Sequence, residues 1–389
     1  MTRPICFVVL SVFIAFCSNA SISRHEVGSG EVSVSKFEVL DLVLRSAEAL
    51  QDPFELDLGA DFVSPSGEKL SLNGFYNDDN EWIVRFSANE EGSWSFETYS
   101  AHAAFAGLGG SIDVGPAAAG RHGAIVISEN DSRKFAYEDG TSYFMNGFEC
   151  DWLFALDGEN PEGAPKTEHL LSLLEDYGFN QVVTTVYSHS VRWEIDPKLK
   201  MYPEHDYGNR ETMFPFGGSN SDPDFSTLNV DFFKRFDRVV ALMDEKGIVA
   251  HLMIYVFNKN VNWAEASSDA DNRYFDYVLN RYGAFSNVVW DIAKEIFRRS
   301  ESYALDRLER FETLNPFDRL VTVHDKHFAE KYPEKLDFFA RQDWRGDLYS
   351  EMLSLYRRFE KPVVNVEHGG YEESTTKCFR ATTPTRKCV

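Results

Sequence analysis

Two short apolar runs in the second half of the chain are each followed closely by a glutamate. Residues 287–292 lead to Glu295, and residues 362–366 lead to Glu367. β-branched runs of this length are typical of buried parallel strands, and barrel enzymes place their chemistry at the carboxyl ends of such strands. Two carboxylates at one barrel mouth could act on a single glycosidic bond, one protonating the leaving oxygen and the other attacking the anomeric carbon.

Other polar and aromatic residues follow the same strand-like runs and could surround a sugar. Tryptophans such as Trp152 and Trp344 are candidate stacking platforms. Any one of these residues could serve packing alone, but their concentration at strand ends favours a sugar cleft. No spacing typical of metal ligands appears, so we expect neither a metal nor another cofactor. The candidate substrate-binding residues are Lys294, Trp152, Tyr187, His189, Arg192, Tyr255, His324, Trp344 and His368.

Strand-like and helix-like patterns alternate through residues 142–389. Amphipathic helices are predicted at 169–177, 231–246 and 350–359, two of them ending just before a glycine. This alternation predicts an α/β fold, a (β/α)8-type TIM barrel, preceded by an all-β unit. The residues after Glu367 are polar, so the barrel is expected to be truncated before strand 8. The predicted strands are 143–148, 180–187, 248–256, 287–292, 320–324, 336–340 and 362–366.

The first part of the mature chain has the pattern of an all-β unit. Short alternating segments at 32–39, 54–58, 82–86 and 94–98 are separated by turn-forming clusters. Residues 25–116 are therefore predicted to form an Ig-like β-sandwich that supports the barrel, and residues 117–141 a linker with a hairpin.

Composition and the N-terminus limit partners and location. The 62 acidic against 39 basic residues argue against nucleic acid as a partner. Residues 1–20 resemble a signal peptide, with Arg3, an apolar stretch and a small-x-small end at Ala20, so we expect a secreted or periplasmic protein. The apolar stretch is too short to span a membrane. Cleavage would leave three cysteines, of which Cys378 and Cys388 could pair.

Several short sequence segments together resemble those of a known family, the apiosidase-like glycoside hydrolases, in which an Ig-like domain precedes the barrel. The resemblance implies clan A architecture, with the acid/base after strand four and the nucleophile after strand seven. The strand count places Glu295 and Glu367 at those positions. Some relatives carry names that refer to collagen binding or collagenase, but the sequence has no H-E-x-x-H protease motif. The segments are Phe75-Tyr-Asn-Asp78, Trp82-Ile-Val-Arg-Phe86, Glu91-Gly-Ser-Trp94, His122-Gly-Ala-Ile125 and Phe135-Ala-Tyr-Glu-Asp-Gly140.

One departure from the family pattern and two alternative functions stay open. Clan A enzymes usually have asparagine before the acid/base, where this chain has Lys294. The lysine could attract an anionic sugar, or it could only pair with a carboxylate. The resemblance implies a hydrolase acting on a poly- or oligosaccharide, and the pair of glutamates predicts retention if the carboxyls lie about 5 Å apart, inversion if they lie nearer 8 Å. The alternatives are an inactive or truncated carbohydrate-binding protein, and a polysaccharide lyase that uses Tyr187, His189 and Arg192.

Overall fold

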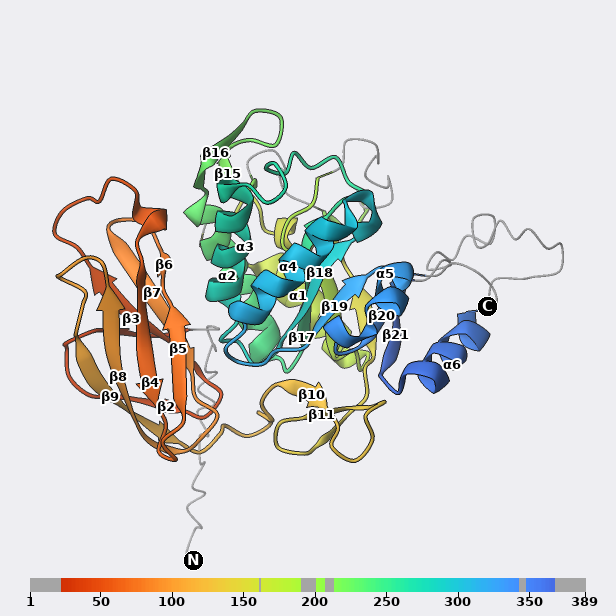
Figure 1. The fold of residues 1–389 in the computed structure, drawn as a ribbon, viewed down its shortest axis with the longest axis horizontal. Helices are drawn as coiled ribbons and strands as arrows, with labels where there is room; N and C mark the ends of the chain where they lie inside the picture. The colour runs from red at the N-terminus through yellow and green to blue at the C-terminus, as the bar shows by residue number, and fades with distance from the viewer. Residues whose placement is uncertain (1–21, 161, 190–200, 207–212, 343–347, 368–389) are drawn as a thin grey trace, which may run out of the picture.

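The computed structural model describes residues 22–160, 162–189, 201–206, 213–342 and 348–367. Its N-terminal part forms two β-sheets that share one apolar core (Figure 1). In β8 (Gly92–Ser100), Trp94, Phe96 and Thr98 are buried and alternate with more exposed residues, as expected for a strand with one face on the core. The four-stranded sheet has the order β1 (Ser23–Glu26), β3 (Val39–Arg45), β7 (Glu81–Ser87), β6 (Phe75–Tyr76), and the five-stranded sheet β2 (Val32–Ser35), β9 (Gly109–Gly115), β8, β4 (Leu58–Val63), β5 (Lys69–Asn73).

Two of the predicted sandwich segments were wrong in detail. Residues 54–58 do not form a strand, because Pro53 begins a short 3-10 helix, η1 (Pro53–Glu55), and β4 starts only at Leu58. Residues 32–39 are not one strand either. Phe37 has a positive φ that turns the chain, so β2 ends at Ser35 and β3 begins at Val39 in the other sheet.

The C-terminal part is a nearly closed barrel of seven parallel strands, as predicted (Figure 1). The first strand is shorter than expected, because Ser142–Tyr143 belongs to a separate sheet, and the sixth strand lies slightly later than expected. Each predicted strand nevertheless overlaps an observed one. In spatial order the strands are β13 (Gly147–Glu149), β14 (Gln181–Thr185), β17 (Val249–Val256), β18 (Val288–Lys294), β19 (Val321–His324), β20 (Phe339–Gln342) and β21 (Val363–Glu367).

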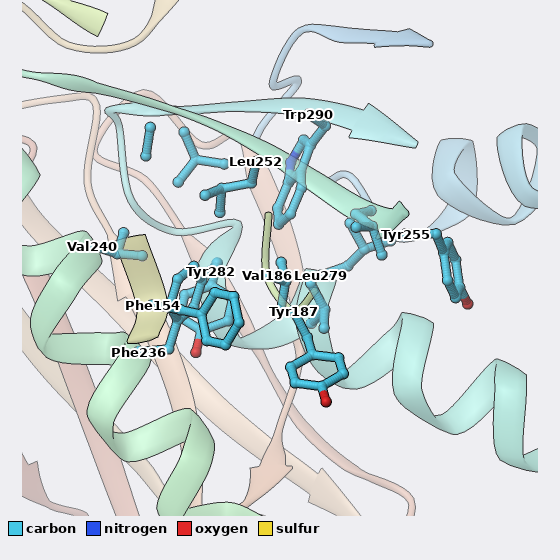
Figure 2. Packing of buried hydrophobic residues seen from close by; sticks show 14 of the residues in the cluster. Phe154, Val186, Tyr187, Phe236, Val240, Leu252, Tyr255, Leu279, Tyr282 and Trp290 are labelled. Atoms are coloured by element: carbon cyan, nitrogen blue, oxygen red, sulfur yellow. The ribbon is translucent and has the colours of Figure 1, made fainter. Parts of the chain in front are cut away.

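Helices connect the barrel strands and pack against their outer faces. Figure 2 shows this layer, where Trp290 and Leu252 of the strands lie in one apolar cluster with Phe236 and Tyr282 of the helices. The first turns of α2 and α3 are capped by Asn229 and Ser268. Throughout the described residues, the helices are too short or too polar to cross a membrane. The helices are α1 (Pro165–Asp176), α2 (Val230–Glu245), α3 (Asp269–Tyr282), α4 (Glu301–Thr313), α5 (Lys326–Lys331) and α6 (Leu348–Phe359), and the loop after β14 contains the hairpin β15 (Phe216–Gly218) and β16 (Pro223–Leu228).

A small antiparallel sheet covers the amino-terminal end of the barrel. It consists of β10 (Ile125–Ile127), β11 (Phe135–Tyr137) and β12 (Ser142–Tyr143). Phe135 of this sheet meets Phe338, just before β20, with ring centroids 5.3 Å apart. The apolar interior is therefore closed at this end, and the carboxyl ends of the strands are left for the site.

A buried ionic network joins the sandwich to the helices of the barrel. Arg85 of β7 binds Asp41 of β3 through Nε at 2.7 Å and donates to the carbonyl of Arg281 at 2.8 Å. Arg281 of α3 in turn binds both oxygens of Asp237 of α2, at 2.8 and 2.6 Å. The two arginines outweigh the effect of burial and hold the pKa of Asp237 at about 2.

Three of the sequence predictions lie outside the described residues. These are the signal peptide at 1–20, the pairing of Cys378 with Cys388, and the lack of strand 8 after Glu367. They stay predictions.

Candidate active site

Lys294 crosses the inside of the barrel and binds carboxylates on the far strands. It ends β18, the fourth strand, yet its Nζ lies 2.7 Å from Glu149 Oε1 on the first strand and 2.7 Å from Glu367 Oε2 on the seventh. Asp151 Oδ1, just after the first strand, is 3.4 Å from the same Nζ. Of its two sequence interpretations, pairing with carboxylates is therefore the one that the contacts favour.

The charges in this cluster change one another's pKa values. Burial disfavours the Lys294 ammonium, but the three carboxylates outweigh burial and raise its pKa. For Glu149, burial dominates and raises its pKa to about 7, although Lys294 opposes the shift. Glu149 thus changes its protonation state near neutral pH, at the carboxyl end of the first strand.

A second lysine balances Asp151. Lys259, in the loop after β17, has its Nζ 3.2 Å from Asp151 Oδ2 and 5.2 Å from the centre of the Trp152 ring. Burial disfavours the Asp151 carboxylate, but Lys294 and Lys259 outweigh it and lower its pKa. Trp152 is only 5% exposed, and Lys259 lies over one face of its indole ring.

Beneath the cluster lies a second polar layer inside the barrel. Asp291 of β18 has Oδ2 3.3 Å from His251 Nε2 and 3.5 Å from His324 Nδ1. These histidines hold the pKa of Asp291 at about 2 despite its burial. His324 Nε2 then reaches to 3.8 Å from Glu367 Oε2. The register of β18 against β19 shifts between Asp291 and Lys294, and such bulges re-aim side chains next to active sites.

Glu295 sits directly after Lys294, in the left-handed conformation, with φ 57° and ψ 48°. A side chain with a Cβ costs about 1–2 kcal/mol in this region, and such strain gathers at functional sites. Its Oε1 accepts from Asn258 Nδ2 at 3.1 Å and its Oε2 from Arg298 Nε at 2.5 Å. Glu295 is therefore fixed at the strand end by two donors, Asn258 from the loop after β17 and Arg298 from the 3-10 helix that follows Glu295.

The structure places the predicted residues in three groups. Lys294, Glu367 and His324 come together at the carboxyl ends of β18, β21 and β19, and Glu295 follows Lys294 at the same end of the barrel. Tyr255 instead faces the helices, because its hydroxyl donates to Asp271 Oδ1 of α3 at 2.7 Å. The remaining residues are either buried, as Trp152, Tyr187 and His189 are, or outside the described part of the chain, as Arg192, Trp344 and His368 are.

The predicted set omitted several residues of the site. Asp291 could have been recognised from the sequence, because a carboxylate inside an otherwise apolar strand must have buried partners. Glu149 and Asp151 follow the first predicted strand, so they lie at a strand end, as the predicted catalytic residues Glu295 and Glu367 do. Arg298, in the 3-10 helix η5 (Ile296–Arg298), is three residues after Glu295, a spacing at which side chains of a helical turn can pair. Lys259 lies in a loop, where no spacing rule links it to Asp151.

Comparison with known families identifies the class of the protein. Residues 129–388 match the family described as "Apiosidase-like, catalytic domain", and residues 33–101 match a domain of unknown function, DUF5060. The first match covers most of the chain. The chain therefore belongs to the apiosidase-like family, and the match includes both glutamates.

A solved structure shares the fold. A protein from Bacteroides vulgatus ATCC 8482, provisionally described as a glycoside hydrolase, is similar with a TM-score of 0.72 and 22% identity over 88% of this chain. A family 5 glycoside hydrolase from the same organism (TM-score 0.43, 18% identity, 64% of this chain and 53% of its own) and a family 5 mannosidase from Rhizomucor miehei (0.46, 14%, 64% and 73%) are more distant. The chain spans 66% of the length of the first structure. No curated protein matches the sequence.

Proposed function

We propose that this protein is an exported glycoside hydrolase that cleaves poly- or oligosaccharides with retention, Glu295 acting as acid/base and Glu367 as nucleophile. The observation that carries the proposal is the position of Lys294. This lysine binds Glu367 directly and is the residue before Glu295, which supports placing both glutamates at the carboxyl ends of the barrel strands. Family membership makes a glycosidic bond the substrate bond that this pair would act on.

The reaction would proceed in two steps. Glu295 gives its proton to the glycosidic oxygen while a Glu367 oxygen attacks the anomeric carbon, so the C–O bond to the leaving sugar breaks and a glycosyl ester forms. Glu295, now a carboxylate, takes a proton from water, and the water oxygen displaces Glu367. Retention requires the two carboxyls to stand roughly 5 Å apart, which leaves no room for a water between Glu367 and the sugar.

The surrounding residues have distinct tasks in this scheme. Lys294 orients Glu367, because its Nζ lies 2.7 Å from Glu367 Oε2. Asn258 and Arg298 orient Glu295 and stabilise its carboxylate after proton transfer. His324, held by Asp291, supports Glu367 from below.

The test is a panel of plant and marine polysaccharides assayed with the wild type, Glu295→Gln and Glu367→Gln. Each substitution removes one reacting group, so we expect a loss of at least about 10²-fold in kcat/KM. Glu295→Gln should retain more activity on an aryl glycoside, whose leaving group needs little protonation. Glu309→Gln, on the exposed face of α4, is the matched control.

The outcomes separate the alternatives. Full activity of both variants would end the assignment of these glutamates. Binding without hydrolysis by the wild type would indicate a carbohydrate-binding protein, and products with a new C=C bond would indicate a lyase. Proton NMR of the first product gives the anomer, and inversion would refute Glu367 as the nucleophile.

Export and the domain boundaries belong to the same proposal. The charged start and apolar stretch of residues 1–20 support cleavage after Ala20, and N-terminal sequencing of the protein from its host tests this. We retain a sandwich at 25–116, a linker at 117–141 and a barrel at 142–389 as the proposed domains.

A further inference from the structure

Three potential metal ligands meet outside the barrel, although the sequence gave no metal-site spacing. His169 lies in the second turn of α1, and Glu204 and His205 belong to the short 3-10 helix η4 (Pro203–His205). One ligand atom from each of the three lies within 4.8 Å of the others. Among the described residues, these are the His, Cys, Asp and Glu side chains that lie close enough together, three or more at a time, to hold a metal ion.

Contacts other than these three side chains hold the two segments together. Lys166 Nζ donates to the backbone carbonyl of Asp206, directly after η4, at 2.8 Å. The start of α1 is in turn fixed by Asp157, whose carboxylate accepts from the backbone N–H groups of Lys166 and Thr167 at 3.1 and 2.9 Å. The ligand atoms are therefore brought close by packing of the backbone, without an ion.

The two imidazole rings have the spacing of rings that share a metal. The ring centroids of His169 and His205 are 5.6 Å apart, with 37° between the ring planes. Two imidazoles bound to one tetrahedral zinc ion through Zn–N bonds of about 2.1 Å have ring centres roughly 5 Å apart. The spacing of the rings is therefore compatible with both imidazoles binding one ion.

The donor set selects among metals. Two neutral imidazole nitrogens and one carboxylate oxygen are a set that Zn²⁺ accepts with a water in its fourth position, whereas Ca²⁺ and Mg²⁺ prefer oxygens alone. We propose that His169, Glu204 and His205 bind one zinc-class divalent ion that fastens η4 to α1. The site is separate from the carboxylates around Lys294, so the zinc proposal can be tested independently of the proposed catalytic glutamates.

The position of the site gives the ion a structural task. η4 lies between β14 and β15 in the sequence, and β14 ends at the carboxyl end of the barrel. α1 begins at the same end, because it follows β13 and runs back along the barrel wall. A metal bridge between η4 and α1 would fix one part of this long connection beside the candidate active site.

The experiment uses the full protein without an affinity tag, stripped of metal with a chelator and then dialysed. Titration with ZnCl₂ in a calorimeter should give one ion per chain, together with a rise in Tm, because an ion that binds only the folded state stabilises it. Cobalt(II) should give the intense visible absorption of a tetrahedral site.

Variants at the ligands decide the assignment. His169→Ala, Glu204→Gln and His205→Ala should each weaken zinc binding by at least about tenfold, since losing even a residue that only supports a ligand costs 10–100-fold. His327→Ala, an exposed histidine on α5, should bind zinc as the wild type does. Circular dichroism checks that each variant is folded. A wild type that binds no zinc, or a His169→Ala/His205→Ala protein that binds it with unchanged affinity and stoichiometry, would overturn the proposal.

Discussion

At the end of β18, two adjacent residues serve opposite sides of the strand end. Lys294 extends into the barrel to Glu149 and Glu367, whereas Glu295 turns toward Asn258 and Arg298. The left-handed backbone at Glu295 makes this possible, because a continued strand would carry the chain past the barrel mouth. The strain is local to Glu295 and directs its side chain to Asn258 and Arg298.

Glu149 is the residue of this cluster whose charge changes near neutral pH. Its ordinary pKa is 4.5 and its pKa in the folded protein is about 7, chiefly through burial. Between these values the folded protein keeps a proton that the unfolded chain releases, so this residue's contribution to stability falls as the pH rises from about 4.5 to 7. Above pH 7 the loss is complete.

Glu149→Gln should therefore remove this pH dependence. Glutamine imitates the protonated acid, so we expect the variant to gain stability relative to the wild type between pH 5 and pH 8, on the order of 1–3 kcal/mol. Urea unfolding of both proteins at the two pH values measures the difference. Glu309→Gln, at an exposed position, is the control. An equal change of stability with pH in Glu149→Gln and wild type would contradict the assigned shift.

Among the elements, α2 and α3 connect the barrel to the sandwich through the pair Asp237 and Arg281. Each carboxylate oxygen of Asp237 accepts from Arg281, and Oδ2 also lies 3.2 Å from Arg85 of β7. All three groups are almost fully buried. Removing one partner of such a network leaves charges without water or counter-charge, which costs more than the intact network contributes.

Asp237→Asn is expected to destabilise the protein by about 3–5 kcal/mol at neutral pH. The ordinary pKa of 3.8 is lowered to about 2, so the stabilisation is present above pH 3.8 and is lost as the pH falls through 2. The penalty in the variant should shrink accordingly below pH 4. Thermal unfolding followed by far-UV circular dichroism at pH 7 and pH 3 tests this, with Glu245→Gln on the exposed end of α2 as control. An unchanged Tm at pH 7 would show that the network carries no stability.

The elements themselves could be predicted from the sequence, because strand and helix periodicity is a local property. All seven barrel strands and their order along the chain were predicted correctly, whereas the strand at 54–58 was wrong because Pro53 and the packing of Phe54 against Tyr76 favour a turn. The partners of Lys294 could not be predicted in the same way. Glu149 and Glu367 are far from it in sequence, and only closure of the barrel brings them together.

On the scale of the whole molecule, the chain is strongly acidic. Its formal charge is −23, a total that includes the carboxylates at the carboxyl end of the barrel, Glu149, Asp151, Glu295 and Glu367. Lys294 is 2% exposed and surrounded by carboxylates, so it adds little attraction for an anion in solution. The long-range field therefore opposes the approach of a negatively charged sugar chain.

This field predicts how salt affects hydrolysis. For a uronate-bearing oligosaccharide that the protein cleaves, kcat/KM should rise several-fold as ionic strength increases from 0.01 to 0.15 M, because the screening length shortens from about 30 to 8 Å. The methyl ester of the same oligosaccharide carries no charge and should show almost constant kcat/KM, which makes it the matched control. Initial rates at substrate concentrations well below KM measure both. If salt instead slowed cleavage of the uronate and left the ester unchanged, a local positive site would outweigh the net charge, and Lys294 and Lys259 would be the first residues to substitute.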